Sequence, residues 1–362
     1  MLMNKNRYQP IEQRVENFKL YYGKRNSRPL LGFFIQSEFP LHRYRAAGSL
    51  PEHKPLSPDD FNVEYYLDDC DRLFLEHEEC GGDFIWSGSA FWGIPWLEAG
   101  LGCSIFADHK TGSIHSQPPV VFKGSQSIPG FDRNSPWMKK TREFLLEMSA
   151  RSGRRWPIGT TRMRGISDLL SALYGGENFI YAMLEEPEEV VKVCERLTEF
   201  WIEYGKFQLE NIPLFHGGVG SFYYHMWAPQ GTVWHQEDAA ALMNPALYNE
   251  FIRPWDEKIV KSFPGCIIHQ HPTRFYPFDE YIEMGMLALE LHIDQGGPSA
   301  EQLYETHLKI LNSKPLIIWG DIPERDLEWI FEKLPPQGLA VNTVVRDKDE
   351  AARLWSKYVA GR

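Results

Sequence analysis

The chain has 362 residues, of which 43% are hydrophobic and 24% charged, and its formal net charge at pH 7 is -11. This composition predicts a globular protein with a large core, and the negative charge argues against nucleic-acid or anionic-membrane binding, since both need a basic face. Five scattered cysteines without Cys-x-x-Cys spacing argue against a disulfide framework and a structural zinc knuckle. The polar N-terminus and the lack of an apolar run of about 18 residues predict a cytoplasmic location.

Short apolar runs alternate with long amphipathic segments, as in β/α units that build a parallel sheet. The apolar runs predict eight strands, at 29–35, 83–86, 157–160, 212–215, 265–269, 286–292, 315–319 and 338–342. Helices are expected at 57–80, 137–151, 166–173, 187–211, 244–262, 299–312, 326–331 and 347–359.

Eight strands with intervening helices predict an α/β protein with a (β/α)8 TIM barrel, formed by residues 1–362 as a single domain. Such a barrel typically needs about 250 residues, so the remainder is expected in an N-terminal extension and in rim insertions. One insertion, at 87–130, follows the second strand, and another, at 217–238, follows the fourth. The carboxyl ends of barrel strands carry the chemistry in this architecture, which makes polar residues there the first candidates.

The fifth predicted strand ends in His269 and His271, whose side chains share a face because residues i and i+2 do so in a strand. Adjacent strands lie about 4.8 Å apart, so Glu290 or His292 of the next strand is expected to join them around one ion. Two histidines and a carboxylate suit a divalent metal such as zinc, iron or manganese. Glu290 is a candidate both for the third ligand and for a catalytic base, and a hydrogen-bonded network without metal is the alternative.

Four further polar residues, at predicted strand ends or in the insertion after the fourth strand, are candidates for catalysis or substrate binding. Glu237 and Asp238 are adjacent and face opposite ways in a strand, so one of them is expected to line the pocket and supply acid–base catalysis. Asp321 is either a carboxylate base or the cap of the next helix, and Asn342 offers an amide at the end of the last strand or is a turn residue.

A dense set of aromatic residues predicts a hydrophobic slot for a planar or apolar part of a small-molecule substrate, although a large core uses the same residues. Two arginines at a strand-to-helix turn suit an anionic substrate group, or Arg164 pairs with a carboxylate at the rim. The candidate substrate-binding residues, besides Asn342, are Trp92, Arg162, Arg164, His216, Tyr223, Trp227 and His235.

A pattern of motifs extends over about the last two thirds of the chain. It comprises segments 164–170, 174–179, 186–190, 237–238, 243–245 and 248–255, the histidine strand and the final strand 338–342. With these motifs the chain resembles the uroporphyrinogen decarboxylase superfamily, in particular its branch of corrinoid-dependent methyltransferases.

The resemblance implies a TIM barrel that moves a methyl group between a small methylated compound and a corrinoid held on a partner protein. In that branch the position of His269 is a zinc-binding histidine, with a cysteine two residues later and another at the end of the last strand. His271 and Asn342 stand at the two cysteine positions. The expected metal ligands are therefore His269 and His271, with Glu290 replacing the thiolates in a harder site.

Two other functions remain open. Decarboxylation of a porphyrinogen needs an arginine-bearing motif near the N-terminus, which Arg43, Arg45 and Gly48 echo while Glu38 opposes it. A barrel that only binds a ligand or a corrinoid protein, without catalysis, is the second alternative. A homodimer is among the assemblies compatible with this sequence.

Overall fold

The computed structural model describes residues 7–37, 39–221, 223–273 and 275–360. Glu38, which opposes the porphyrinogen motif, and most of the polar N-terminus therefore lie outside the described residues. In the part of the chain that is described, no helix is both long enough and apolar enough to cross a membrane.

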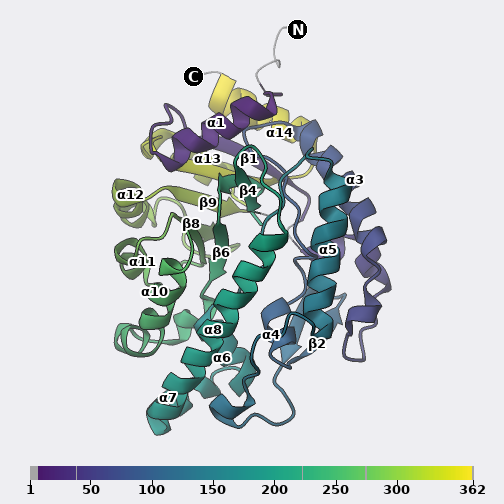
Figure 1. The fold of residues 1–362 in the computed structure, drawn as a ribbon. Coiled ribbons are helices and arrows are strands. Elements are labelled where there is room, and N and C mark those ends of the chain that lie inside the picture. Colours follow the sequence, from purple (N-terminus) through teal and green to yellow (C-terminus); the bar gives the residue numbers. More distant parts are fainter. Residues whose placement is uncertain (1–6, 38, 222, 274, 361–362) are drawn as a thin grey trace.

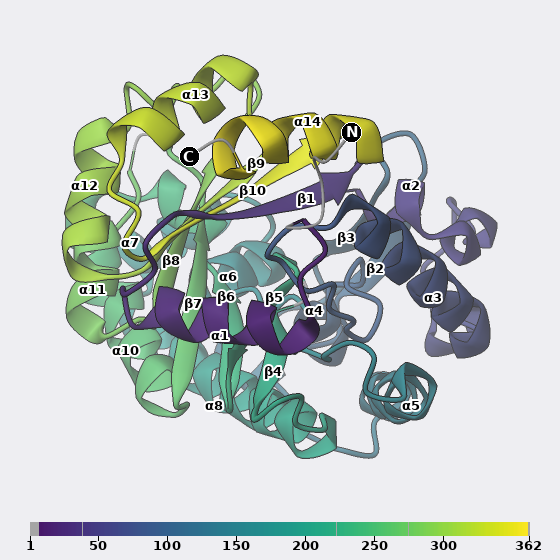
Figure 2. The same ribbon diagram turned by 90° about the horizontal axis from the view of Figure 1, so that it is seen from above.

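A curved, six-stranded parallel sheet forms most of the barrel wall (Figure 2). Five of its strands confirm the predicted runs, because alternating or continuous apolar residues pack on both faces of a covered parallel sheet. The order across the sheet is β1 (Leu30–Ile35), β10 (Leu339–Val345), β9 (Leu316–Gly320), β8 (Ala288–Ile293), β7 (Gly265–Gln270) and β6 (Thr232–Gln236).

Two irregular segments, 83–88 and 157–164, stand between the outer strands β1 and β6 and complete a TIM-barrel-like ring. The Asp83 N–H donates to the Leu31 carbonyl, 2.9 Å away. Isolated bridges then join Gly88 to Ile158 and residue 164 to residue 236 of β6. The predicted α/β barrel is therefore confirmed, but the regular strands predicted at 83–86 and 157–160 are wrong.

A hairpin of β4 (Gly218–Ser221) and β5 (Met226–Pro229) explains why these two segments are irregular. The Ile85 N–H donates to the His225 carbonyl, and the Gly220 N–H donates to the Ile158 carbonyl. The donor–acceptor distance is 2.8 Å in both bonds. The hairpin thus takes up backbone groups that a regular ladder between the two segments would use.

The fourth predicted strand, 212–215, is also wrong. The chain turns there through two residues in the left-handed region, His216 at φ 48° and Gly217 at φ 79°. The fourth barrel strand is instead β6, which lies inside the segment predicted as a rim insertion. A short apolar run such as 212–215 does not distinguish a turn from a short strand, whereas β6 is buried on all five residues.

Helices cover the outside of the barrel, and α8 matches the predicted range 187–211 residue for residue (Figure 1). Pro187 in its first turn and the acidic residues Glu188 and Glu189 suit a helix start. Helix α1, which was not predicted, contacts β5 and lies across the hairpin (Figure 2). The first eight helices are α1 (Ile11–Tyr22), α2 (Pro40–Arg43), α3 (Val63–Cys80), α4 (Trp96–Gly100), α5 (Pro136–Ser152), α6 (Ile166–Tyr174), α7 (Asn178–Glu185) and α8 (Pro187–Asn211).

The C-terminal half continues the strand–helix alternation. The segment predicted as one helix at 244–262 is divided, because a π-helical turn at Tyr248–Ile252 separates α9 from α10. A second antiparallel hairpin, β2 (Ser104–Asp108) with β3 (Ser113–Gln117), lies in the rim insertion that follows segment 83–88. The remaining helices are α9 (Pro245–Leu247), α10 (Arg253–Lys261), α11 (Phe278–Met284), α12 (Tyr304–Ser313), α13 (Glu324–Lys333) and α14 (Lys348–Trp355).

Candidate metal centre at the barrel mouth

The two histidines at the carboxyl end of β7 point their rings toward each other. His269 is buried, with 3% of its side chain exposed, and His271 is half-buried at 31%. Their Nε2 atoms are 2.9 Å apart. The sequence prediction that the pair converges on one point at the mouth is thus matched by the geometry.

A carboxylate on the neighbouring strand holds each ring from its other nitrogen. Glu290, the register partner of His269 on β8, accepts a short hydrogen bond from His269 Nδ1. Asp294 accepts from His271 Nδ1 at 2.8 and 2.9 Å. With Nδ1 carrying the proton in both rings, each neutral imidazole directs the lone pair of Nε2 at the other. Two facing lone pairs repel, so a proton or a metal ion has to lie between them.

The charges at this site favour a cation. Burial lowers the pKa of His271, but the hydrogen bond to Asp294 and the charge of Asp238 outweigh burial and raise it to about 9. Burial raises the pKa of Glu290, and the charge of His269 and its hydrogen bond reverse this, which leaves the pKa at about 2. Glu290 is therefore ionised at neutral pH, and the site attracts positive charge.

Asp238 completes a group of three possible metal ligands. Its Oδ1 lies 3.9 Å from His269 Nε2, and the carboxylate also accepts a short hydrogen bond from Gln236. The ligand atoms of Asp238, His269 and His271 all lie within 4.8 Å of one another. Two imidazoles and a carboxylate fit zinc with an open coordination position, and hydrogen-bonded Nδ1 atoms are usual for metal-ligating histidines.

Glu290 does not fit the predicted role of third ligand to an ion between the two histidines. It contacts His269 Nδ1, whereas the shared position lies at Nε2 on the opposite side of the ring. Glu290 is instead a residue that positions His269. It also belongs to a second, fully buried group with His269 and His292, in which His292 Nδ1 lies 3.5 Å from Glu290.

The histidine pair forms part of the wall of an open pocket of about 180 Å³. Tyr223, at the tip of the β4–β5 hairpin, packs against Trp319, with ring centroids 5.1 Å apart, and meets Trp92 edge-on at 5.7 Å. Arg162 adds a cationic group to the wall, and burial together with nearby Arg164 lowers its pKa. Trp92, Arg162 and Tyr223 thus lie where substrate-binding residues were predicted.

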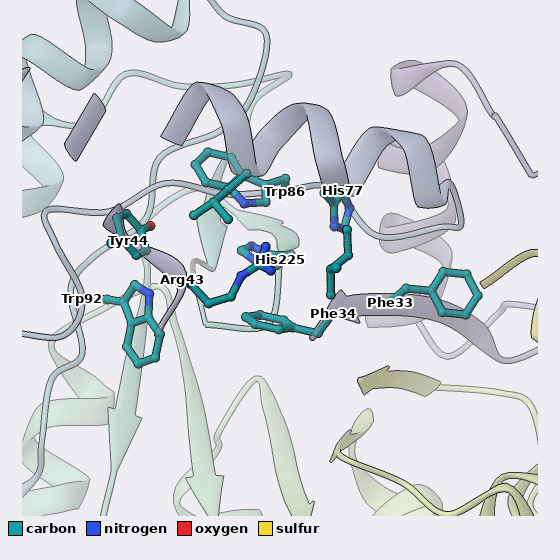
Figure 3. Close-up of a pocket in the computed structure, with 10 residues that line it drawn as sticks. Phe33, Phe34, Arg43, Tyr44, His77, Trp86, Trp92 and His225 are labelled. Atoms are coloured by element: carbon teal, nitrogen blue, oxygen red, sulfur yellow. The ribbon is translucent and has the colours of Figure 1, made fainter. Parts of the chain in front are cut away.

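A smaller cavity of about 30 Å³ shares Trp92 with this pocket (Figure 3). Its wall includes Phe34, Trp86 and His225, and the His225 ring stacks 5.0 Å from Phe34. Burial lowers the pKa of His225 well below its usual range, which keeps the ring neutral. An open pocket and a smaller, largely aromatic cavity beside it therefore lie in the region where composition predicts an aromatic slot.

Two predicted residues, Glu237 and His235, point away from the pocket. Alternation along β6 directs both of them to the outside of the barrel wall, toward the helices. Glu237 accepts from the backbone N–H groups of Ile166 and Ser167 at 2.5 and 2.9 Å. Of the adjacent pair, Asp238 is consequently the residue that lines the pocket, and the structure does not place Glu237 or His235 near substrate.

The hairpin also separates predicted residues from the site. His216 is exposed at the open end of the hairpin, and Trp227 is buried there, donating from Nε1 to the Phe215 carbonyl at 2.8 Å. The hairpin turn with Tyr223 lies at the other end. His216 and Trp227 are therefore outside the pocket, and their predicted substrate contacts do not fit this geometry.

The remaining candidates occupy three different places. Asp321 is exposed and lines a separate surface groove beside β9 and β10. Asn342 is fully buried, and its amide donates to the Tyr224 carbonyl at 2.9 Å, deeper in the barrel. Arg164 pairs with Glu98 at 2.9 Å and with Asp168 at 3.4 Å, as in the alternative that assigned it to a rim carboxylate.

Sequence reasoning assigned no role to Asp294 or to Gln236. Asp294 shares the strand face of Glu290, so the period-two pattern was the available signal. The hydrogen bond from Gln236 to Asp238 depends on how the chain leaves β6, for which the sequence has no comparable pattern.

The fold is similar to that of a methyltransferase from Methanosarcina mazei. The two structures superpose with a TM-score of 0.64, over 96% of this chain and 98% of the other, at 12% sequence identity. No protein-family model matches the sequence, and no curated protein does so either. The likeness therefore supports the barrel fold over nearly the whole chain.

Proposed function

We propose that this protein is a methyltransferase that moves a methyl group between a small methylated compound and a corrinoid held on a partner protein. The observation that carries the proposal is the pair of imidazoles at the barrel mouth, each held by a carboxylate, with Nε2 atoms 2.9 Å apart. The whole-chain likeness to the methyltransferase fold supports it.

His269, His271 and Asp238 would hold a zinc ion or a similar divalent cation. When bound, such an ion acts as a Lewis acid toward the heteroatom that carries or receives the methyl group. Glu290 and Asp294 fix the two rings so that both Nε2 atoms face the same point. Their role is to position the ligands and to increase the basicity of each ring.

The pocket walls supply orientation and exclude water. Tyr223 and Trp92 give an apolar surface against which a methyl group is desolvated. Arg162 is placed to bind an anionic group of the methylated compound. In demethylation a corrinoid on the partner protein would accept the methyl group, the donor heteroatom would keep the bonding electron pair, and a proton from solvent entering the open pocket would neutralise it.

A single-turnover assay tests the proposal. The protein is mixed with reduced cobalamin and a panel of methylated amines, thiols and ethers, and formation of methylcobalamin is followed by its absorbance. We expect turnover with the wild type and with His216→Ala, an exposed residue outside the pocket. The variant His269→Ala/His271→Ala is expected to lose at least a hundredfold in rate, and equal rates in all three proteins would refute the assignment.

The structure gives less support to porphyrinogen decarboxylation. Arg43 is engaged by Glu76 at 2.8 Å and lines the small apolar cavity, and Arg45 is exposed. The two arginines thus lie in different surroundings, one paired with a carboxylate and the other exposed. Coproporphyrin among the oxidised products of a reaction with uroporphyrinogen would establish that activity instead.

A further inference from the structure

A second group of potential ligands lies behind the barrel wall, on the face of β6 that is turned away from the mouth. It consists of His235 on β6, Glu237 directly after β6, and Asp256 on α10. Each of the three residues is at most 1% exposed. None of these residues lines the mouth pocket. The group is therefore separate from the site of the proposed function.

The distances from His235 to the two carboxyl groups suit a shared cation better than direct hydrogen bonds. His235 Nε2 lies 3.5 Å from Asp256 Oδ1 and 3.7 Å from Glu237 Oε1. A hydrogen bond would require about 2.7–3.2 Å. Ligand atoms about 2.0–2.1 Å from a tetrahedral zinc ion stand about 3.4 Å from one another. The imidazole nitrogen is thus at the separation expected for a common ion.

Two of the three ligand atoms lack other partners. Among the described residues, neither His235 Nε2 nor Asp256 Oδ1 has a hydrogen-bond partner, although both are buried. Tyr248 donates to the other oxygen of Asp256 at 2.8 Å and so orients this carboxylate. Buried polar atoms without partners are costly, and an ion bound between them is one of the standard explanations.

Neighbouring groups hold Glu237 in place and engage the next carboxylate, Asp168. Glu237 accepts hydrogen bonds from two backbone N–H groups and from the Ser167 hydroxyl at the start of α6, which fix the orientation of its carboxyl group. The next carboxylate, Asp168, is already paired with Arg164. Glu237 and Asp256 are left as two buried carboxyl groups beside the imidazole of His235.

We propose that His235, Glu237 and Asp256 bind a divalent cation of the zinc class at a closed structural site that ties β6 to α10 and to the start of α6. The site is buried on all sides, so the ion enters during folding and does not exchange while the protein stays folded. Its occupant is independent of the methyl-transfer chemistry.

The first test uses the variant His269→Ala/His271→Ala, produced in medium with zinc and dialysed against a chelator while folded. We expect plasma mass spectrometry to find about one equivalent of zinc per chain, released when the same sample is unfolded in guanidinium. A folded variant that contains no metal would overturn the proposal and leave a proton shared by Glu237 and Asp256 as the compensating charge. This variant keeps His235, Glu237 and Asp256 and is folded in the assay. A folding defect therefore cannot explain an absence of metal.

The second test identifies the ligands. In the same background, Asp256→Asn and His235→Gln are expected to lose the retained zinc, whereas His307→Leu, which alters another buried histidine outside the group, is expected to keep it. X-ray absorption of the retained zinc should show nitrogen and oxygen ligands with one imidazole and no sulfur. Retention of zinc in Asp256→Asn and His235→Gln, or sulfur in the spectrum, would contradict the assignment. Loss of methyl transfer in the mouth variant with retained zinc would separate this site from the proposed function.

Discussion

At the scale of single residues, the mouth site depends on the carboxylates behind the histidines as much as on the histidines themselves. Asp294 determines which nitrogen of His271 carries the proton and where the other one points. Without that bond the ring is free to rotate and its Nε2 is a weaker ligand. The same reasoning applies to Glu290 and His269.

We therefore expect Asp294→Asn to weaken zinc binding at the mouth about tenfold to a hundredfold, the range usual for lost hydrogen-bond partners of ligating histidines. Competition with a chromophoric chelator measures the affinity. Asp279→Asn, an exposed carboxylate on α11 that pairs with Lys309, serves as the control with unchanged affinity. An unaltered affinity in Asp294→Asn would show that Asp294 does not support the site.

His307 on α12 offers a prediction about acid stability. Burial lowers its pKa to about 3, and among the described residues neither ring nitrogen has a partner. The unfolded chain takes up a proton on this histidine below about pH 6.5, and the folded chain does so only near pH 3. The unfolded state thus binds more protons in this window, and His307 makes stability fall as the pH falls from about 6.5 to 3.

Replacing His307 by Leu is expected to reduce this loss. Relative to the wild type, the variant should gain about 2 kcal/mol of unfolding free energy between pH 7 and pH 5. Urea unfolding at both pH values measures the difference. Leu311→Met on the same helix changes no titratable group and should show no such gain, and parallel pH dependence of His307→Leu and wild type would contradict the expectation.

The sequence identified the centre of the mouth site but not its limits. Strand periodicity placed His269, His271 and Glu290 together because the alternation of side chains in a strand is a local property. Whether Glu290 meets Nδ1 or Nε2 depends on the register of β7 against β8 and on the ring rotation, which are tertiary properties. His216 and Trp227 were predicted to contact substrate because this segment was interpreted as a rim loop. The hairpin formed there holds both residues outside the pocket.

At the scale of secondary structure, five of the six regular barrel strands could be predicted, since buried parallel strands are continuous apolar runs. Segments 83–88 and 157–164 each contain a short apolar stretch, but they bond to a hairpin that the apolar pattern does not reveal. Strand β6 was assigned to an insertion because 212–215 was taken as the fourth strand and β6 follows it. Strands were therefore predictable where both neighbours are regular strands. They were not predictable where an inserted hairpin takes up the backbone hydrogen-bonding groups.

The contact of β1 with segment 83–88 provides a test at this scale. A Cβ atom at Gly32 would overlap the ring and Cβ of Phe84, which is fully buried. We expect Gly32→Ala to lower the unfolding free energy by about 1–3 kcal/mol, as overpacking does in cores. Gly48→Ala, where a methyl group would meet no atom within 4 Å, is the matched control. Equal denaturation midpoints for the two variants would show that the contact relaxes without cost.

At the scale of the whole molecule, the mouth site joins β6 and β7, and β8 supports it through Glu290. Metal binding there should therefore increase global stability. Zinc at about 100 times its dissociation constant is expected to add about 2.7 kcal/mol to the unfolding free energy. Thermal unfolding with and without added zinc measures the effect in chelator-treated protein. The variant His269→Ala/His271→Ala should show no response, and an equal response would place the stabilising ion elsewhere.

The isolated bridges between segments 83–88 and 157–164 have a consequence for how the barrel moves. Strands β7 to β10 each bond to a neighbour on both sides, whereas this seam has few backbone bonds to lose. Amide hydrogens along the seam should consequently exchange with solvent faster than those of the sheet. Arg162 belongs to one side of the seam, and Trp92 follows the other. Opening there would widen the entrance for a bulky second reactant while the six-stranded sheet and the histidine pair stay in place.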